Sequence, residues 1–127
     1  MLELTSTSLA DTPPIEVTLG RVLYHPEAVM LGIEPTEDLA PVLLAARSAT
    51  QQVTGQEGVT TSGPGDWVPH MTLCYSTANQ PAKPLIDAIG LTIGHCTVTI
   101  DTMTLVVQWG PERQWAWQPM GEVHIGR

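Results

Sequence analysis

The chain is organised around one stretch of sequence, Trp67-Val68-Pro69-His70-Met71-Thr72-Leu73-Cys74-Tyr75. Its alternation predicts a β-strand, with His70, Thr72 and Cys74 on one face and Met71, Leu73 and Tyr75 on the other. On such a strand the imidazole and the hydroxyl of His70 and Thr72 lie about 7 Å apart. A proton carrier beside a hydrogen-bond donor suits phosphate chemistry. A core strand with an incidental histidine fits the same short pattern, so the rest of the chain has to distinguish the two.

Length and composition indicate a single globular domain. The chain has 127 residues, of which 43% are hydrophobic, so one domain with its own core is expected over residues 1–127. No apolar run reaches the length of a membrane span, and the N-terminus lacks a signal-peptide pattern. A cytoplasmic protein with no membrane partner is therefore expected. Cys74 and Cys96 lie in apolar strand-like runs, which favours buried, reduced thiols.

The charge balance argues against a long nucleic-acid partner. Thirteen acidic residues stand against five basic ones, for a formal net charge of −8. The basic residues are scattered, whereas proteins that bind long nucleic acids carry a basic stripe. Any phosphate-bearing substrate is therefore expected to be small, or a single chain end, and not a long duplex. No Cys/His cluster has zinc spacing and the acidic residues are spread out, so neither a metal nor a cofactor is predicted.

The first half of the chain predicts a hairpin and a helix. Residues 1–14 are rich in Ser and Thr and end in two prolines, which favours a flexible arm or a short edge strand. Residues 15–24 and 29–33 indicate the two strands of an antiparallel hairpin, joined by a proline turn. A helix is then predicted from Asp38, as its N-cap, to Gly55.

The second half predicts more strands and a second helix. A short helix is expected over 81–89, with Pro81 in its first turn. The longest strand-like run, 96–108, changes phase at Asp101-Thr102, which indicates a bulge or bend. Trp115 and Trp117 are expected on one face of a further strand, with a last short strand at 123–125. The predicted fold is therefore α+β, a mostly antiparallel sheet with two helices packed on it.

The stretch around His70 resembles the second signature of the 2H phosphoesterases, the superfamily that includes RNA 2′,3′-cyclic phosphodiesterases, also called 2′-5′ RNA ligases. That signature is His-x-Thr/Ser followed by an apolar residue, commonly with Pro before the His. The residues Pro69-His70-Met71-Thr72-Leu73 fit it. The order of the flanking elements over roughly residues 15–126 is also similar. The resemblance implies a two-lobed α+β fold, in which two His-x-Thr motifs face each other across a cleft.

The resemblance also implies a reaction and its residues. His70 would act as general acid or base and Thr72 would hold the phosphate of a small cyclic phosphodiester or an RNA 2′,3′-cyclic phosphate end. Candidate substrate contacts are Tyr75 and Trp67, at the two ends of the motif strand, together with Arg113. Lys83 is a further cation that could contact one phosphate.

The sequence departs from the family pattern because it has no first His-x-Thr motif. The chain is expected to begin just before the hairpin that follows that motif and its helix in family members, so 15–127 would be an incomplete 2H domain. His95-Cys96-Thr97 fits the short pattern, but it lies where the family has an ordinary strand and is interpreted as a chance match. His25 is expected in a turn and His124 near the surface of the last strand.

One catalytic histidine supplies only half of what the reaction needs, because cyclic phosphodiester hydrolysis by this route uses a base and an acid on opposite sides of phosphorus. Three alternatives stay open. The chain could be a truncation with little activity. Two chains could form a homodimer in which two copies of His70 share a cleft, and an exposed sheet edge and apolar face would favour that association. The scaffold could also be reused to bind a small molecule or a partner chain.

Overall fold

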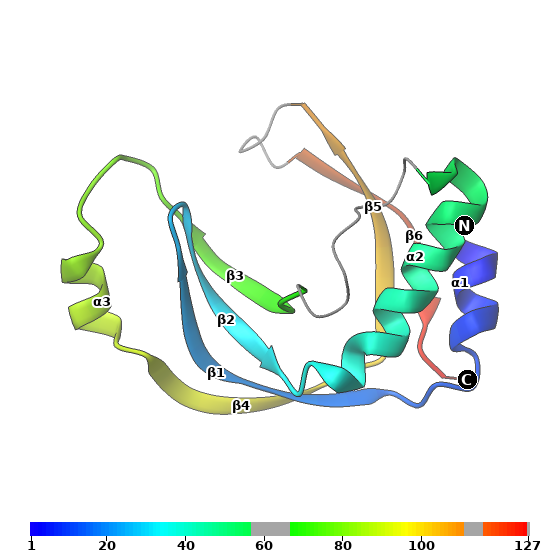
Figure 1. Ribbon diagram of the computed structural model, residues 1–127, viewed down its shortest axis with the longest axis horizontal. Coiled ribbons are helices and arrows are strands. Elements are labelled where there is room, and N and C mark those ends of the chain that lie inside the picture. The colour runs from blue at the N-terminus through cyan, green and yellow to red at the C-terminus, as the bar shows by residue number, and fades with distance from the viewer. Residues whose placement is uncertain (57–66, 111–115, 127) are drawn as a thin grey trace.

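The computed structural model describes residues 1–56, 67–110 and 116–126. Its elements are α1 (Leu2–Leu9), β1 (Ile15–His25), β2 (Ala28–Glu34), the 3₁₀ turn η1 (Glu37–Leu39), α2 (Ala40–Thr54), β3 (His70–Tyr75), α3 (Lys83–Ile89), β4 (Thr92–Ile100), β5 (Thr102–Trp109) and β6 (Ala116–His124). The strands form two antiparallel sheets, one in the order β3-β2-β1-β4 and one made of β5 and β6 (Figure 1). The α+β prediction is confirmed, with three α-helices among the described residues where two were predicted.

The prediction of an arm or edge strand over residues 1–14 is wrong, because Leu2–Leu9 form a helix. Leu9 is 1% exposed and packs against Ala45 of α2 and the end of β6, so α1 belongs to the core. Its helix-disfavouring hydroxyl residues are accommodated within the helix itself. The Thr5 hydroxyl donates to the Met1 carbonyl at 3.0 Å, and the Ser8 hydroxyl to the Leu4 carbonyl at the same distance. Burial of one apolar face thus outweighs the low helix propensity of Ser and Thr.

The hairpin and the end of α2 agree with the predictions. β1 and β2 pair antiparallel across the turn Pro26-Glu27. Helix α2 ends at Gly55, whose φ of 77° favours glycine. The predicted N-cap is wrong, since Asp38 lies inside η1 and the α-helix begins at Ala40. The 3₁₀ turn directs Leu39, 5% exposed, into the core beneath β1, which sets where the helix can start.

The later elements differ from the predictions in detail. Helix α3 begins at Lys83, so Pro84 and not Pro81 occupies its first turn. The predicted bend at Asp101 is confirmed, because β4 ends just before it and β5 begins just after it in the other sheet. The strand predicted at 123–125 is the end of β6, and Trp115 lies outside the described residues. Figure 1 shows α1 and α2 side by side at one end of the molecule and α3 at the other.

Besides the cluster around Leu9, the buried side chains of the described residues gather on one face of the four-stranded sheet, which we call the apolar face. Two buried clusters occupy it: Leu19, Val22, Val29 and Leu31 form one, and Ile15, Val17 and Leu39 the other. Ile89 of α3 packs against the first cluster and Val42 of α2 against the second. The side chains on the opposite face of these strands take no part in the two clusters.

The prediction of buried cysteines is wrong. Cys74 and Cys96 are free thiols, as expected, but both are exposed. They lie on β3 and β4, the two outer strands of the sheet, and an outer strand lacks a neighbour on one side. Within the described part of the chain, no helix has the length and apolar character needed to cross a membrane.

Candidate active site

Strand β3, which carries the His-x-Thr motif, is held to β2 beyond both of its ends. The Ile33 N–H donates to the Pro69 carbonyl at 3.0 Å, just before His70. The Ser76 N–H donates to the Glu27 carbonyl at 2.8 Å, just after Tyr75. An outer strand that is tied at both ends has a defined register, so the position of its side chains follows from the pairing.

The register places His70 and Thr72 away from the core. His70 pairs with Gly32 and Thr72 pairs with Met30, while Met71 pairs with the buried Leu31. Cross-strand partners lie on the same face of a sheet. Both motif residues therefore share the face opposite to the apolar face, which we call the polar face. This agrees with the prediction that the imidazole of His70 and the hydroxyl of Thr72 lie on one face of the strand.

A β-bulge corrects the predicted faces of the last two residues of the strand. The pairing shifts between Met30 and Val29, so Thr72 pairs with Met30 but Cys74 pairs with Val29 and Tyr75 with Ala28. The extra residue in β3 reverses the alternation. Cys74 consequently lies on the apolar face, and Tyr75 lies on the polar face with His70. Strict alternation along the strand predicts Cys74 on the face of His70 and Tyr75 on the other face, so both predictions are wrong.

The imidazole of His70 is exposed and oriented by its own backbone. Its Nδ1 lies 2.8 Å from the carbonyl oxygen of Val68. A carbonyl only accepts hydrogen bonds, so Nδ1 carries the proton in this contact. The neutral ring then has its lone pair on Nε2, which is the arrangement a proton acceptor needs.

A second bulge brings a cation to the polar face that the sequence reasoning missed. Leu19 pairs with Ile33 and Val22 with Leu31, so Gly20 and Arg21 both lie opposite Gly32. The Arg21 Nη1 is 3.6 Å from the Glu34 Oε1, and both side chains are more than half exposed. A surface pair of this kind contributes little to stability, so Arg21 is available for another anion. The sequence carries a signal for this bulge: the apolar residues of β1 are two positions apart up to Leu19, but Leu19 and Val22 are three positions apart.

The fourth strand brings His95 to the same face. Cys96 pairs with Leu19 of the apolar face, which puts His95 on the other side, beside Gly20. A Cβ placed on Gly20 would lie 2.6 Å from the His95 Nδ1, so the ring lies directly over the backbone of β1. The sequence interpretation took His95-Cys96-Thr97 as a chance match, and nothing local to those three residues signals this placement.

The other candidates from the sequence lie elsewhere. Trp67 is half-buried against the cluster of Ile15, Val17 and Leu39, so core packing accounts for its position. Lys83 pairs with Asp87 at 2.6 Å on the surface of α3. His25 and His124 are exposed, at the hairpin turn and the end of β6, as expected. Arg113 lies outside the described residues.

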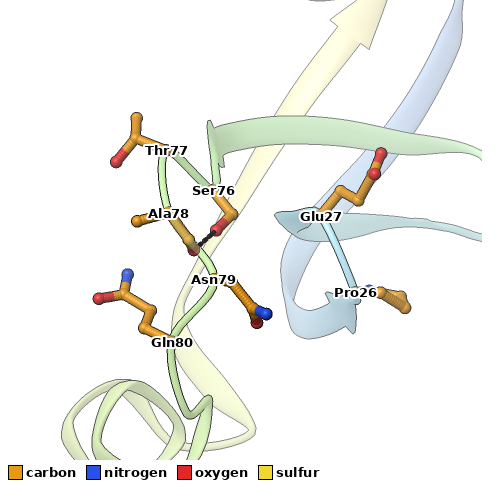
Figure 2. A pocket seen from close by; sticks show the side chains of 7 residues that line it. All are labelled: Pro26, Glu27, Ser76, Thr77, Ala78, Asn79 and Gln80. Carbon is orange, nitrogen blue, oxygen red and sulfur yellow. Dashed lines mark hydrogen bonds between the residues drawn. The ribbon is translucent and has the colours of Figure 1, made fainter.

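A hollow of about 380 Å³ lies beside the far end of β3. It is formed by Pro26 and Glu27 of the hairpin turn and by residues 76–80, as Figure 2 shows. The Ser76 hydroxyl donates to the Ala78 carbonyl at 2.7 Å and shapes the segment that follows the strand. The hollow begins six residues after His70, about 20 Å along the strand, so it is separate from the His-x-Thr pair. Among the described residues, no group of three His, Cys, Asp or Glu could hold a metal ion.

Fold and site together define the class of protein: an α+β chain of two antiparallel sheets in which an exposed His70 and a half-buried Thr72 share one sheet face. The crystal structure of TT0787 from Thermus thermophilus is similar to it, with a TM-score of 0.72 and 17% identity over 98% of this chain and 67% of that chain. At that identity the similarity shows the fold. No curated protein matches the sequence. The family model of the 2′-5′ RNA ligase superfamily matches residues 1–112, and the chain belongs to this superfamily.

Proposed function

We propose that the protein is a 2H-type phosphoesterase that opens a small cyclic phosphodiester or the 2′,3′-cyclic phosphate at an RNA end. The observation that carries the proposal is the placement of His70 and Thr72 on the open polar face, with the His70 Nδ1 held by Val68. Membership of the 2′-5′ RNA ligase superfamily supports the same class of reaction.

In the proposed reaction, water attacks phosphorus and one P–O ester bond breaks. An imidazole accepts the proton of the water, and a proton is delivered to the oxygen that leaves. The Thr72 hydroxyl donates a hydrogen bond to a phosphate oxygen beside the imidazole. The products are a phosphomonoester and a free hydroxyl, so no cofactor is consumed.

The charges support a small substrate. The chain carries a net charge of −8, and on the polar face the described residues include Arg21, already beside Glu34. A phosphate chain bound through many contacts would need a stripe of such cations. A single phosphate group can be bound by one or two cations.

The proposal is tested by following 2′,3′-cyclic AMP with ³¹P NMR. Purified protein is expected to convert it to a single phosphomonoester. A sample that leaves the substrate unchanged at high enzyme concentration, over a day, would contradict the proposed function.

Replacing Thr72 with valine is expected to lower kcat/KM about tenfold to hundredfold, because a hydrogen bond to a charged group contributes about 1.5–3 kcal/mol. Valine keeps the shape and removes the hydroxyl. Thr72→Ser restores the donor and is the matched control. Equal rates for the valine and serine variants would rule out a role for the hydroxyl.

A second candidate function, association with another copy of the chain, is favoured by the β5–β6 sheet. Among the described residues this sheet has two strands, and Trp109 and Trp117, which the register places on opposite faces of it, are 60% and 53% exposed. Strands from a second copy that paired with an edge of this sheet would extend it and cover part of this apolar surface. Sedimentation at micromolar concentration is expected to give a dimer under this alternative, and a monomer at all concentrations would exclude it.

A further inference from the structure

We propose that two copies of the chain associate edge to edge through β4, in antiparallel pairing centred on Val98, and so join their four-stranded sheets into one continuous sheet. The inference does not rest on the proposed function, because His70 takes no part in this contact. It also differs from association through the β5–β6 sheet, because it uses an edge of the other sheet.

The first observation is that the outer side of β4 is open. Among the described strands, β4 pairs with β1 on one side and ends the four-stranded sheet on the other. All residues from 92 to 99 are exposed, including Ile93 at 39% and Val98 at 37%. On such an edge, every second residue directs its N–H and C=O away from the sheet, where another strand can bond to them.

The second observation is that β4 lacks the features by which edge strands avoid pairing. Charged side chains, prolines and bulges are the usual ones. Residues 92–100 include no charged residue and no proline. The other outer strand, β3, directly follows Pro69 and has a bulge at Leu73. Of the two outer edges of this sheet, β4 is therefore the one that accepts a further strand.

The third observation identifies the partner as a second copy. The pairing of β4 with β1 shifts between residues 92 and 96 and is regular over residues 96–100. These five residues read Cys-Thr-Val-Thr-Ile, an order of apolar and hydroxyl side chains that is the same in both directions. Two such strands, antiparallel about Val98, place Thr97 opposite Thr99 of the second copy and Val98 opposite its own equivalent. A contact of this symmetric kind closes at two chains.

The pairing also keeps both faces of the sheet continuous. Cys96, Val98 and Ile100 pair with three buried residues of β1 and lie on the apolar face, whereas Thr97 and Thr99 lie on the polar face. Directly opposite residues of an antiparallel pair share a face. Apolar side chains therefore meet apolar ones across the contact, and hydroxyl groups meet hydroxyl groups.

The charges of the chain permit this contact in spite of the net charge of −8. Glu16 lies opposite Thr99 on β1, so at least three strand spacings, about 14 Å, separate it from the second copy's Glu16. That distance exceeds the screening length of about 8–10 Å at ordinary ionic strength. Asp101, which follows β4, lies opposite His95 of the second copy in this register, and not opposite another acid.

The arrangement leaves the His-x-Thr strand uncovered. β3 is at the far side of the sheet from β4, so the two β3 strands end the continuous sheet, about 33 Å apart measured along it. Each copy thus keeps a separate His70 and Thr72. Association should therefore not change the activity of either copy.

Disulfide trapping tests the register, in a background that carries Cys74→Ser and Cys96→Ser. Val98→Cys is expected to form a cross-linked dimer under mild oxidation, because directly opposite Cα atoms lie about 4.5–5.5 Å apart, within the span of a disulfide. Thr97→Cys is the matched control on the same edge. It lies diagonal to its own equivalent, with Cα atoms about 7–8 Å apart, and is expected to form little. A yield from Val98→Cys no higher than from Thr97→Cys would overturn the proposal.

Sedimentation equilibrium from micromolar to millimolar concentration tests the association itself. Val98→Lys is expected to raise the Kd of the dimer about tenfold or more, because it places two ammonium groups opposite each other on paired strands. Val53→Lys, at an exposed valine of α2, is the matched control and is expected to keep the wild-type Kd. Circular dichroism checks that both variants are folded. A wild type that stays monomeric throughout, or a dimer that Val98→Lys leaves unchanged, would contradict the inference.

Two further measurements separate this inference from the proposals above. Val98→Lys is expected to keep the wild-type kcat for 2′,3′-cyclic AMP, so an inactive wild type that dimerises through Val98 would contradict the proposed function and leave this inference standing. Trp117→Ser is expected to leave the dimer intact. A dimer that is weakened by Trp117→Ser and not by Val98→Lys would assign the contact to the β5–β6 sheet and overturn the inference.

Discussion

Replacing His70 with glutamine should lower kcat for 2′,3′-cyclic AMP about 1,000-fold, because general acid–base catalysis by a positioned side chain contributes 10²–10⁴-fold. Glutamine is of similar size and can still donate toward the Val68 carbonyl, which His70 contacts at 2.8 Å. It has no group that takes up a proton near neutral pH. The loss should therefore fall on kcat, with KM changed by less than a factor of about five.

The measurement is initial rate against substrate concentration, with the phosphomonoester product followed by ³¹P NMR. Stability must be compared as well, and His70 is exposed on an outer strand, so the variant should unfold within about 0.5 kcal/mol of the wild type. A kcat within tenfold of the wild-type value would show that His70 is a surface residue and that the chemistry lies elsewhere.

Replacing Leu9 with alanine should cost about 3–5 kcal/mol of unfolding free energy. Leu9 is 1% exposed and packs against Ala45, Val123 and Ile125, so its removal leaves a cavity between α1, α2 and the end of β6. The total free energy of unfolding of a natural domain is only about 5–15 kcal/mol. This substitution is therefore expected to have the largest effect on stability of those considered.

Leu4→Ala is the matched control, on the same helix with the side chain 37% exposed. It should cost less than about 1 kcal/mol, because little apolar surface leaves a buried site. Urea unfolding followed by circular dichroism gives both values. Similar small losses for the two variants would mean that α1 detaches from the core in solution and behaves as the arm that the Ser/Thr-rich sequence predicts.

Local pattern was sufficient for most elements of the fold. The hairpin of β1 and β2, the stop of α2 at Gly55 and the bend at Asp101 all follow from turn residues and apolar spacing, and the structure confirms them. The placement of His70 and Thr72 on one face of their strand followed from alternation over three residues. These features depend on neighbours in the chain, so they are visible without the partner strands.

Features that depend on distant residues were predicted wrongly or missed. Helix α1 forms because Leu9 meets Val123, more than a hundred positions away in the chain, and the exposure of the cysteines reflects which strands lie outermost. The faces of Cys74 and Tyr75 are set by a bulge that exists only in the pairing with β2. Propensity and alternation carry no information on such contacts.

By itself, the sequence determined that the chain is an α+β protein of the 2H type and that His70 and Thr72 stand together on one strand. Only the tertiary structure decided which groups join them. The sheet order and two bulges bring Arg21, Tyr75 and His95 to the same face, across two glycines. The physical reason is that a motif encodes neighbours on one strand, whereas a site is assembled across strands, where register sets which side chains meet.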